Sequence, residues 1–161
     1  MAAPFVIRPT PARRLATAAF IFLAAVGAAR AQAMRDAAGV DRELPKPAII
    51  LFWAPWCAPC RVETRNLGEL TRAAGSTPVV VVPMDDDRRT RDALSGVAPS
   101  RVLFARGGGY RLLRRWAPDA SGLPVSIALN SVGGVCAAVA GALTIDDVRR
   151  LGIACAQKPH A

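Results

Sequence analysis

Short apolar runs alternate with helically spaced segments along most of this chain. Residues 48–53 and 79–82 are continuous apolar runs, and the second consists entirely of valine, which is typical of strands buried on both faces of a sheet. Shorter apolar runs predict three further strands, at 102–104, 124–129 and 135–140. The last two runs are joined by a polar, glycine-containing segment, which indicates a hairpin.

Helices are predicted between these strands. Apolar residues at helical spacing follow Cys57, and Gly75 marks the end of that segment. The expected helices are 57–74, 86–94, 110–116 and a last one that begins after Thr144 as N-cap and ends near Gly152. Residues 34–44 predict a short helix or a frayed lead-in. This alternation predicts an α/β fold with a central mixed β-sheet flanked by helices.

The first 33 residues have the form of a secretory signal peptide. A basic stretch precedes the apolar run 15–29, and both Ala29-Arg30-Ala31 and Ala31-Gln32-Ala33 fit the small-x-small pattern of a cleavage site. The run is shorter than the roughly 20 residues that a membrane-spanning helix needs, although a retained membrane anchor stays open as the alternative. The sequence therefore predicts a signal peptide at 1–33, an exported domain at 34–161 and a periplasmic location.

Composition and charge narrow the class of partner. The 161 residues carry a formal charge of +9, which taken alone suggests nucleic-acid binding. Four positive charges lie in 1–33, which contains no acid, so 34–161 carries +5. The arginines around Gly107-Gly108-Gly109 indicate a solvated face, with an acidic partner or a membrane surface as the alternative. No Lys-Ser/Thr follows the glycines, as a phosphate-binding loop requires, and we expect no nucleic-acid binding.

The segment Cys57-Ala58-Pro59-Cys60 carries the clearest chemical signal. It follows a predicted buried strand and opens a predicted helix. Free N–H groups and the dipole at a helix N-terminus favour thiolate, and can lower a thiol pKa from about 8.5 to roughly 3.5–7.5. Two intervening residues place the second sulfur within disulfide reach. We therefore expect Cys57 to attack a partner disulfide and Cys60 to resolve the mixed disulfide.

The run Phe52-Trp53-Ala54-Pro55-Trp56-Cys57-Ala58-Pro59-Cys60, with Gly122-Leu123-Pro124 opening a later strand, resembles the thioredoxin fold. Within that fold it resembles the exported TlpA/ResA-like thiol–disulfide oxidoreductases, over about 47–151. The resemblance implies that Pro124 is cis and faces the active-site disulfide. The groove for a protein partner then consists of Trp56, Ala58, Pro59, Leu123 and Pro124. The family often carries an acid three residues after the second Cys, where Glu63 stands one helical turn away and could help move the Cys60 proton.

The chain also departs from the family pattern. Thioredoxins proper have a buried acid six residues before the first Cys, where this chain has Leu51. Residues 116–121 replace the aromatic-Gly-Val that is expected before Pro124. We also expect the N-terminal hairpin of the TlpA-like group to be missing, because few residues separate the signal from the first buried strand. An ordinary solvated helix acid stays open as the alternative for Glu63.

The two remaining cysteines are expected to form a structural disulfide. Cys136 begins the last strand and Cys155 follows the last helix, and a helix that returns along its strand brings these ends together. The alternatives are two unpaired small hydrophobic residues or a second redox pair. Zinc at Cys57 and Cys60 would require two more ligands, and the single His is His160 near the C-terminus, so no metal is expected.

The residues and the resemblance together predict an exported reductase of protein disulfides, of the type that serves apocytochrome or metal-site maturation. It would need no cofactor beyond the redox-active Cys57–Cys60 disulfide. Its partners would be protein thiols and disulfides and a membrane electron donor of the thiol-transfer type, and it would be a monomer. The alternatives are a thiol oxidase or isomerase, a copper- or zinc-binding chaperone, and a binding module with a structural disulfide.

Overall fold

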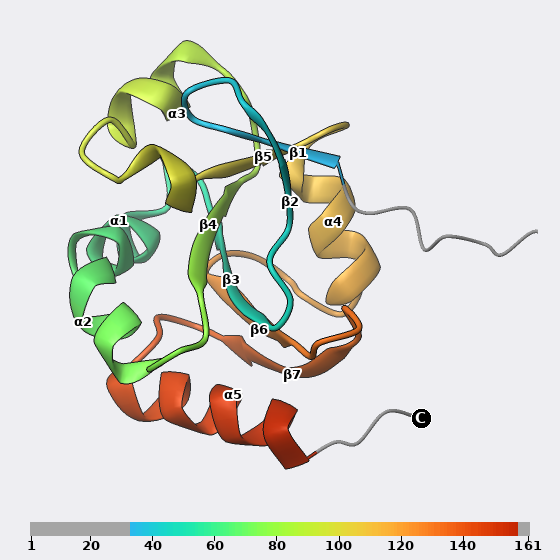
Figure 1. The fold of residues 1–161 in the computed structure, drawn as a ribbon. Helices are drawn as coiled ribbons and strands as arrows, with labels where there is room; N and C mark the ends of the chain where they lie inside the picture. Colours follow the sequence, from blue (N-terminus) through green and yellow to red (C-terminus); the bar gives the residue numbers. More distant parts are fainter. Residues whose placement is uncertain (1–32, 158–161) are drawn as a thin grey trace, which may run out of the picture.

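The computed structural model describes residues 33–157, so the expected signal peptide and His160 lie outside the described residues. A four-stranded sheet forms its centre (Figure 1). Its strands, in spatial order, are β4 (Val79–Pro83), β3 (Ala48–Trp53), β6 (Val125–Leu129) and β7 (Val135–Ala140). β3 pairs parallel with β4 and antiparallel with β6, and β6 pairs antiparallel with β7. The predicted mixed sheet is therefore confirmed.

A second, three-stranded sheet lies beyond β4. It consists of β2 (Asp41–Glu43), β1 (Ala33–Asp36) and β5 (Leu103–Ala105). The prediction of a helix or frayed lead-in at 34–44 is wrong, and so is the expected absence of an N-terminal hairpin. The reason is Asp36, whose carboxylate accepts hydrogen bonds from the N–H groups of Ala38 and Val40 at 3.0 and 2.9 Å. An aspartate that bonds the backbone ahead of it stabilises a turn in preference to a helix.

The helices follow the predicted order with two differences in extent. They are α1 (Ala58–Arg65), α2 (Leu67–Ala73), α3 (Arg88–Ala93), α4 (Gly109–Trp116) and α5 (Ile145–Gln157), with a short 3-10 turn at Pro99–Arg101. The helix predicted after Cys57 is divided at Asn66 into α1 and α2. The last helix continues past Gly152 to Gln157, so the prediction that it ends near Gly152 is wrong. Gly152 has no positive φ, and a Cβ there would meet no atom within 4 Å, so nothing at this glycine ends the helix.

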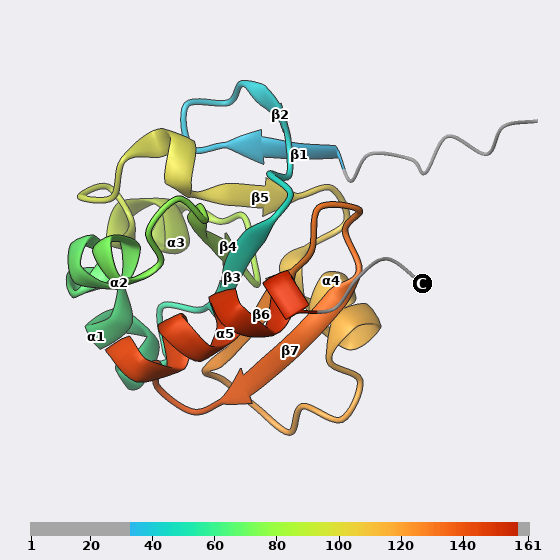
Figure 2. The same cartoon turned by 60° about the horizontal axis from the view of Figure 1, so that its bottom comes forward.

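The helices cover the two faces of the central sheet. Figure 2 shows α5 crossing in front of β3, β6 and β7, with α4 behind the sheet, and α5 also packs on α2. The ring of Phe52 in β3 lies 6.4 Å from that of Trp116 in α4, centre to centre. Because neighbouring residues of a strand point to opposite faces, Leu51 points to the face covered by α1, α2 and α5.

Gly109 fixes α4 against the end of β4. A Cβ atom at this position would lie 2.1 Å from the carbonyl oxygen of Pro83, so no larger residue fits without moving backbone. The Gly109 N–H donates to the carbonyl of Met84 at 3.0 Å. The triglycine segment therefore brings the first turn of α4 next to the end of β4.

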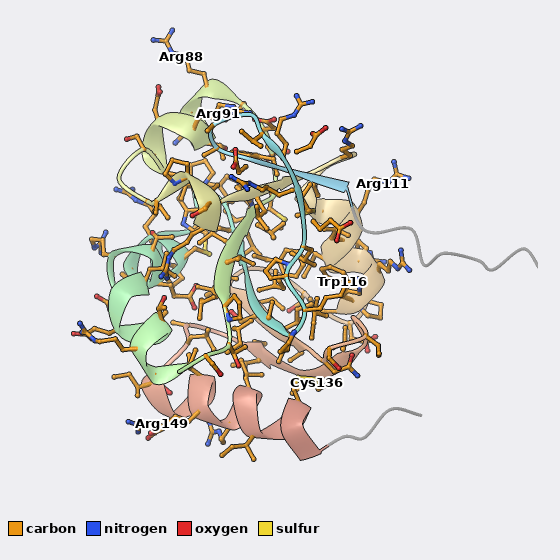
Figure 3. The ribbon with its side chains drawn as sticks, in the orientation of Figure 1. Arg88, Arg91, Arg111, Trp116, Cys136 and Arg149 are labelled. Carbon is orange, nitrogen blue, oxygen red and sulfur yellow. A yellow bond between two sulfur atoms is a disulfide. The ribbon has the colours of Figure 1, made fainter. Side chains whose placement is uncertain are left out.

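The positive charge is spread over several elements. Figure 3 shows Arg88, Arg111 and Arg149 pointing outward from α3, α4 and α5. Arg88 and Arg149 lie within ion-pair distance of Asp92 and Asp146. This distribution is that of a solvated surface. In the described part of the chain, none of the helices has the length and apolar character to cross a membrane.

Candidate active site

Cys57 and Cys60 form a disulfide at the start of α1, with an S–S distance of 2.00 Å and 5.3 Å between their Cα atoms. Cys57 is the N-cap residue of the helix, and its Sγ accepts a hydrogen bond from the Cys60 N–H at 3.3 Å. Pro59 lies in the first helical turn, where a missing N–H has no intrahelical partner to lose. After reduction, the same N–H groups are placed to stabilise a thiolate on Cys57.

The two cysteines differ in access to solvent. Cys57 is 4% exposed and Cys60 is fully buried. The Sγ of Cys60 lies 3.9 Å from the carbonyl oxygen of Phe52, inside the sheet–helix layer. Cys57 is therefore the more accessible of the two cysteines, as a nucleophile at this site would have to be.

A groove begins at Trp56, the residue before Cys57. Trp56 is 65% exposed in its lining, and Leu123 also lines it. The full lining is Trp56, Met84, Asp85, Tyr110, Leu113, Arg114, Ala120, Ser121, Gly122 and Leu123. Ala58 and Pro59 are exposed in the turn after Cys57. Pro124 is buried next to this groove, and the Leu123–Pro124 bond is cis, as the resemblance implies.

Of the ten residues in this lining, the sequence predicted two as site residues, Trp56 and Leu123. Met84 and Asp85 follow β4, and Tyr110, Leu113 and Arg114 belong to α4. No local pattern marks these residues as site residues. They reach the groove because Met84 N–H donates to the Trp53 carbonyl at 2.8 Å and because Gly109 lets α4 approach β4.

Glu63 lies inside the protein, one helical turn after Cys60. It is 3% exposed, so it is not the solvated acid that the sequence left open. Its Oε1 accepts a hydrogen bond from the Leu143 N–H at 2.7 Å, in the loop between β7 and α5. Burial raises the pKa of the Glu63 carboxyl above its usual value, and the Leu143 N–H partly offsets this. Leu51, in place of a strand acid, is buried and apolar.

Cys136 and Cys155 are joined by a second disulfide, with an S–S distance of 2.01 Å and 5.2 Å between their Cα atoms. It links the start of β7 to the last turns of α5, and Figure 3 shows Cys136 above that end of the helix. Both residues are partly exposed. Within 33–157, no group of three or more His, Cys, Asp or Glu residues is arranged to hold a metal ion.

Comparison with known proteins places this geometry in a family. No protein-family model matches the sequence. The thioredoxin of Alicyclobacillus acidocaldarius is 31% identical over 75 residues, which cover 45% of this chain and 71% of that thioredoxin. The chain belongs to the thioredoxin family. The thiol:disulfide interchange protein HelX of Rhodobacter capsulatus is 28% identical over 105 residues, which cover 65% of this chain and 58% of HelX.

This thioredoxin-family chain spans about three fifths of the length of several relatives, including HelX and the thioredoxin of Pyropia yezoensis, which is matched over 59% of its length. Solved structures show the same fold. The thio-disulfide isomerase of Thermus thermophilus superimposes with a TM-score of 0.58 at 24% identity, over 76% of this chain and 90% of that one. StoA of Bacillus subtilis gives 0.57 at 19% identity, over 74% and 93%. The predicted thioredoxin-like fold is confirmed.

Proposed function

We propose that this protein is an exported thiol–disulfide oxidoreductase that reduces disulfides in protein partners. The observation that carries the proposal is the Cys57–Cys60 disulfide at the N-terminus of α1, with Cys57 as N-cap directly after Trp56, which lines a groove. Such a disulfide needs no bound cofactor, because the two sulfur atoms store the electron pair themselves. The relatedness to HelX and to thioredoxins supports the same chemistry.

The reaction proceeds in two exchange steps. In the reduced protein, the Cys57 thiolate attacks one sulfur of the partner disulfide, which forms a mixed disulfide and releases one partner thiolate. Cys60 then loses its proton, attacks the Cys57 sulfur and releases the second partner thiolate. The protein ends as the Cys57–Cys60 disulfide, and each partner thiolate takes up one proton. One electron pair and two protons pass to the partner, so the step balances.

Glu63 is the proposed proton acceptor for Cys60. It lies one turn further along α1, buried on the same side of the sheet, and its raised pKa makes the carboxylate a better base than an exposed glutamate. The carboxylate takes the Cys60 proton during the second step and later returns it to solvent or to a leaving thiolate. This assignment replaces the strand acid of thioredoxins, whose position holds Leu51.

The partner is a polypeptide that lies in the groove between Trp56 and Leu123. Trp56 and Leu123 line the groove together with Tyr110, Leu113 and Arg114 of α4, while Ala58 and Pro59 are exposed directly after Cys57 and Pro124 is buried behind Leu123. We propose a partner of the cytochrome- or metal-site-maturation type, on the basis of the relatedness to HelX. Electrons to regenerate the dithiol would come from a membrane thiol carrier, and the protein would act as a monomer.

Export is part of the proposal, and the position of β1 supports one of the two cleavage sites over the other. Ala33 pairs with Glu43, and the side chain of Met34 is fully buried. Cleavage after Ala31 leaves β1 whole, whereas cleavage after Ala33 places a charged amine at the buried Met34. Mass spectrometry of the exported protein should therefore find Gln32 as its first residue. A mass that begins at Met34, or one that retains 1–31, contradicts this cleavage site.

A trapping experiment tests the function. In Cys60→Ser, the mixed disulfide on Cys57 cannot be resolved, so exported partner proteins should accumulate on Cys57 and be released by reductant. Cys57→Ser is the matched control and should trap none. A redox titration then sets the direction of electron flow: a potential of about −250 mV fits a reductant, whereas one of about −120 mV marks an oxidant. The absence of any trapped partner would contradict the proposed function.

A further inference from the structure

Three buried polar atoms near the active site have no hydrogen-bond partner. Within 33–157 the buried side-chain nitrogen and oxygen atoms without a partner are Trp53 Nε1, Glu63 Oε2, Ser126 Oγ and Thr90 Oγ1. Thr90 belongs to α3, whereas Trp53 and Ser126 belong to adjacent strands of the central sheet and Glu63 to the helix packed on it. Unpaired buried polar groups are rare in native proteins, and they concentrate where a function uses them.

Ser126 faces the same layer as Glu63. In the sheet it pairs with Leu51 of β3 on one side and Val139 of β7 on the other, so these three side chains share a face. Because Phe52 faces α4, this is the face covered by α1 and α5. Ser126 is fully buried, and it is the polar residue within an otherwise apolar strand.

The elements that hold the Glu63 carboxylate flank β6, the strand of Ser126, in the sheet. Glu63 starts from α1, which packs on β3, and its Oε1 bonds to Leu143, which follows β7. In the sheet β6, which carries Ser126, lies between β3 and β7. Leu143 also lies near Ser126 along the length of β6. The loop that carries Leu143 leaves the sheet at Gly141, and the Gly141 N–H donates to the carbonyl of Pro124, two residues before Ser126.

We propose that Ser126 is a positioning residue for Glu63: its hydroxyl supplies the hydrogen bond for Glu63 Oε2, through one bridging water, and holds the carboxylate behind Cys60. A water is the bridge because Ser126 Oγ and Glu63 Oε2 are not in direct contact, and a water with two or more polar partners is stable in a protein interior. The proposal rests on the proton-accepting role proposed for Glu63. In this proposal the polar partner of Glu63 is Ser126, the cross-strand neighbour of Leu51 on the same face of the sheet.

The charged groups near Glu63 are exposed or already paired, so the proposed hydrogen bond should have a measurable effect on the Glu63 pKa. On α1, Arg61 and Arg65 are exposed. On α5, the Asp147 carboxylate is already bound by Thr144 and Arg150. Within the described residues, the Leu143 N–H is the one hydrogen bond that the carboxylate accepts. A further donor would stabilise the ionised form, so removal of the Ser126 hydroxyl favours the protonated form.

The test follows the carboxyl carbon of Glu63 by NMR in the oxidised protein, with Glu63→Gln used to assign the signal. Ser126→Ala should raise the Glu63 pKa by about one pH unit, the size expected for one lost hydrogen bond to a charged group. Ser126→Thr keeps the hydroxyl and should leave the pKa near that of the wild type. Thr90→Val removes the other unpartnered buried hydroxyl, in α3, and should not move it.

The outcomes separate this proposal from the proposed function. An unchanged Glu63 pKa in Ser126→Ala, with a wild-type amide spectrum, overturns the role of Ser126 even if the protein exchanges disulfides normally. If Ser126→Thr and Ser126→Ala shift the Glu63 pKa by the same amount, the role of Ser126 is also overturned, because the hydroxyl would then have no effect. If the wild type fails to exchange disulfides, the proposed function fails, whereas the pKa difference is measured without any exchange. With both intact, Ser126→Ala should slow release of the second partner thiol several-fold and move its pH profile upward.

Discussion

A hydrogen bond of 2.7 Å joins the carboxylate of Glu63 to the backbone N–H of Leu143, across 80 residues of sequence. It ties the helix that begins at Cys57 to the loop that precedes α5. The bond holds an ionisable group in the layer next to Cys60, where water has little access. The acid is therefore held in place by a tertiary contact of the fold.

Burial of Glu63 predicts a pH-dependent cost to stability. The pKa of Glu63 is raised in the folded protein, so the folded state holds this proton more tightly than the unfolded state does. The free energy of unfolding should therefore fall as pH rises from the ordinary value near 4.5 through the folded pKa. Glu63→Gln has no carboxyl group to titrate, so its free energy of unfolding should rise relative to that of the wild type over this pH range. Urea unfolding of the oxidised proteins at several pH values measures the difference, and parallel pH profiles would refute the assignment.

The Cys136–Cys155 disulfide predicts stability without catalysis. The two cysteines are 19 residues apart and close the β7–α5 unit, so the double variant Cys136→Ser/Cys155→Ser should lose about 3 kcal/mol of unfolding free energy. Serine fits these partly exposed positions with little penalty. Disulfide exchange at Cys57 should be retained. Loss of exchange in a variant that stays folded would instead identify Cys136–Cys155 as a second redox pair.

The sequence predicted what depends on neighbouring residues and missed what depends on distant ones. Cys57 and Cys60 were recognisable because a buried strand, a two-residue spacer and a helix start all lie within one short segment. The burial of Glu63 was not, because its partner is a backbone N–H far along the chain, which no sequence pattern marks. The β1–β2 hairpin was missed because one carboxylate, that of Asp36, decides it by bonding two N–H groups of the turn.

The groove shows the same division. Trp56 could be placed at the surface from its position beside Cys57, and it is 65% exposed. Tyr110 and Arg114 could not be placed there, because their approach depends on Gly109 packing against the Pro83 carbonyl. The triglycine run is visible in the sequence. Its close backbone contact with the end of β4, however, depends on how α4 packs against β4, which no local pattern predicts.

Trp56 is predicted to bind the partner and to add little to the fold. Its side chain is exposed and lines the groove together with Tyr110, which is 61% exposed. Trp56→Ala should lower kcat/KM for a protein disulfide about tenfold, as loss of an aromatic anchor does, with the effect mainly in KM. Val132→Ala is the matched control: it removes another exposed apolar side chain, in the β6–β7 turn, and should change neither. Equal kinetics for Trp56→Ala and wild type would exclude this anchor.

Asp147 predicts how α5 responds to acid. Its Oδ2 accepts from the Thr144 hydroxyl at 2.6 Å and from the Thr144 N–H at 2.9 Å, while the Asp147 N–H donates to the Thr144 hydroxyl at 3.2 Å. This reciprocal capping box, together with Arg150, lowers the pKa of Asp147 to about 2. A lowered folded pKa contributes stability that is present above the ordinary value of 3.8 and is lost as pH falls toward about 2.

Asp147→Asn should therefore cost about 1 kcal/mol of unfolding free energy at neutral pH, the usual worth of a helix cap. The deficit should shrink between about pH 4 and pH 2, where the wild-type carboxyl also becomes neutral. Asp146→Asn is the control, since Asp146 makes an exposed ion pair with Arg149 at 2.9 Å, and such pairs contribute little. Urea unfolding of the three proteins across this range decides the matter. A deficit that stays constant down to pH 2 would mean that Asp147 acts through its shape and not through its charge.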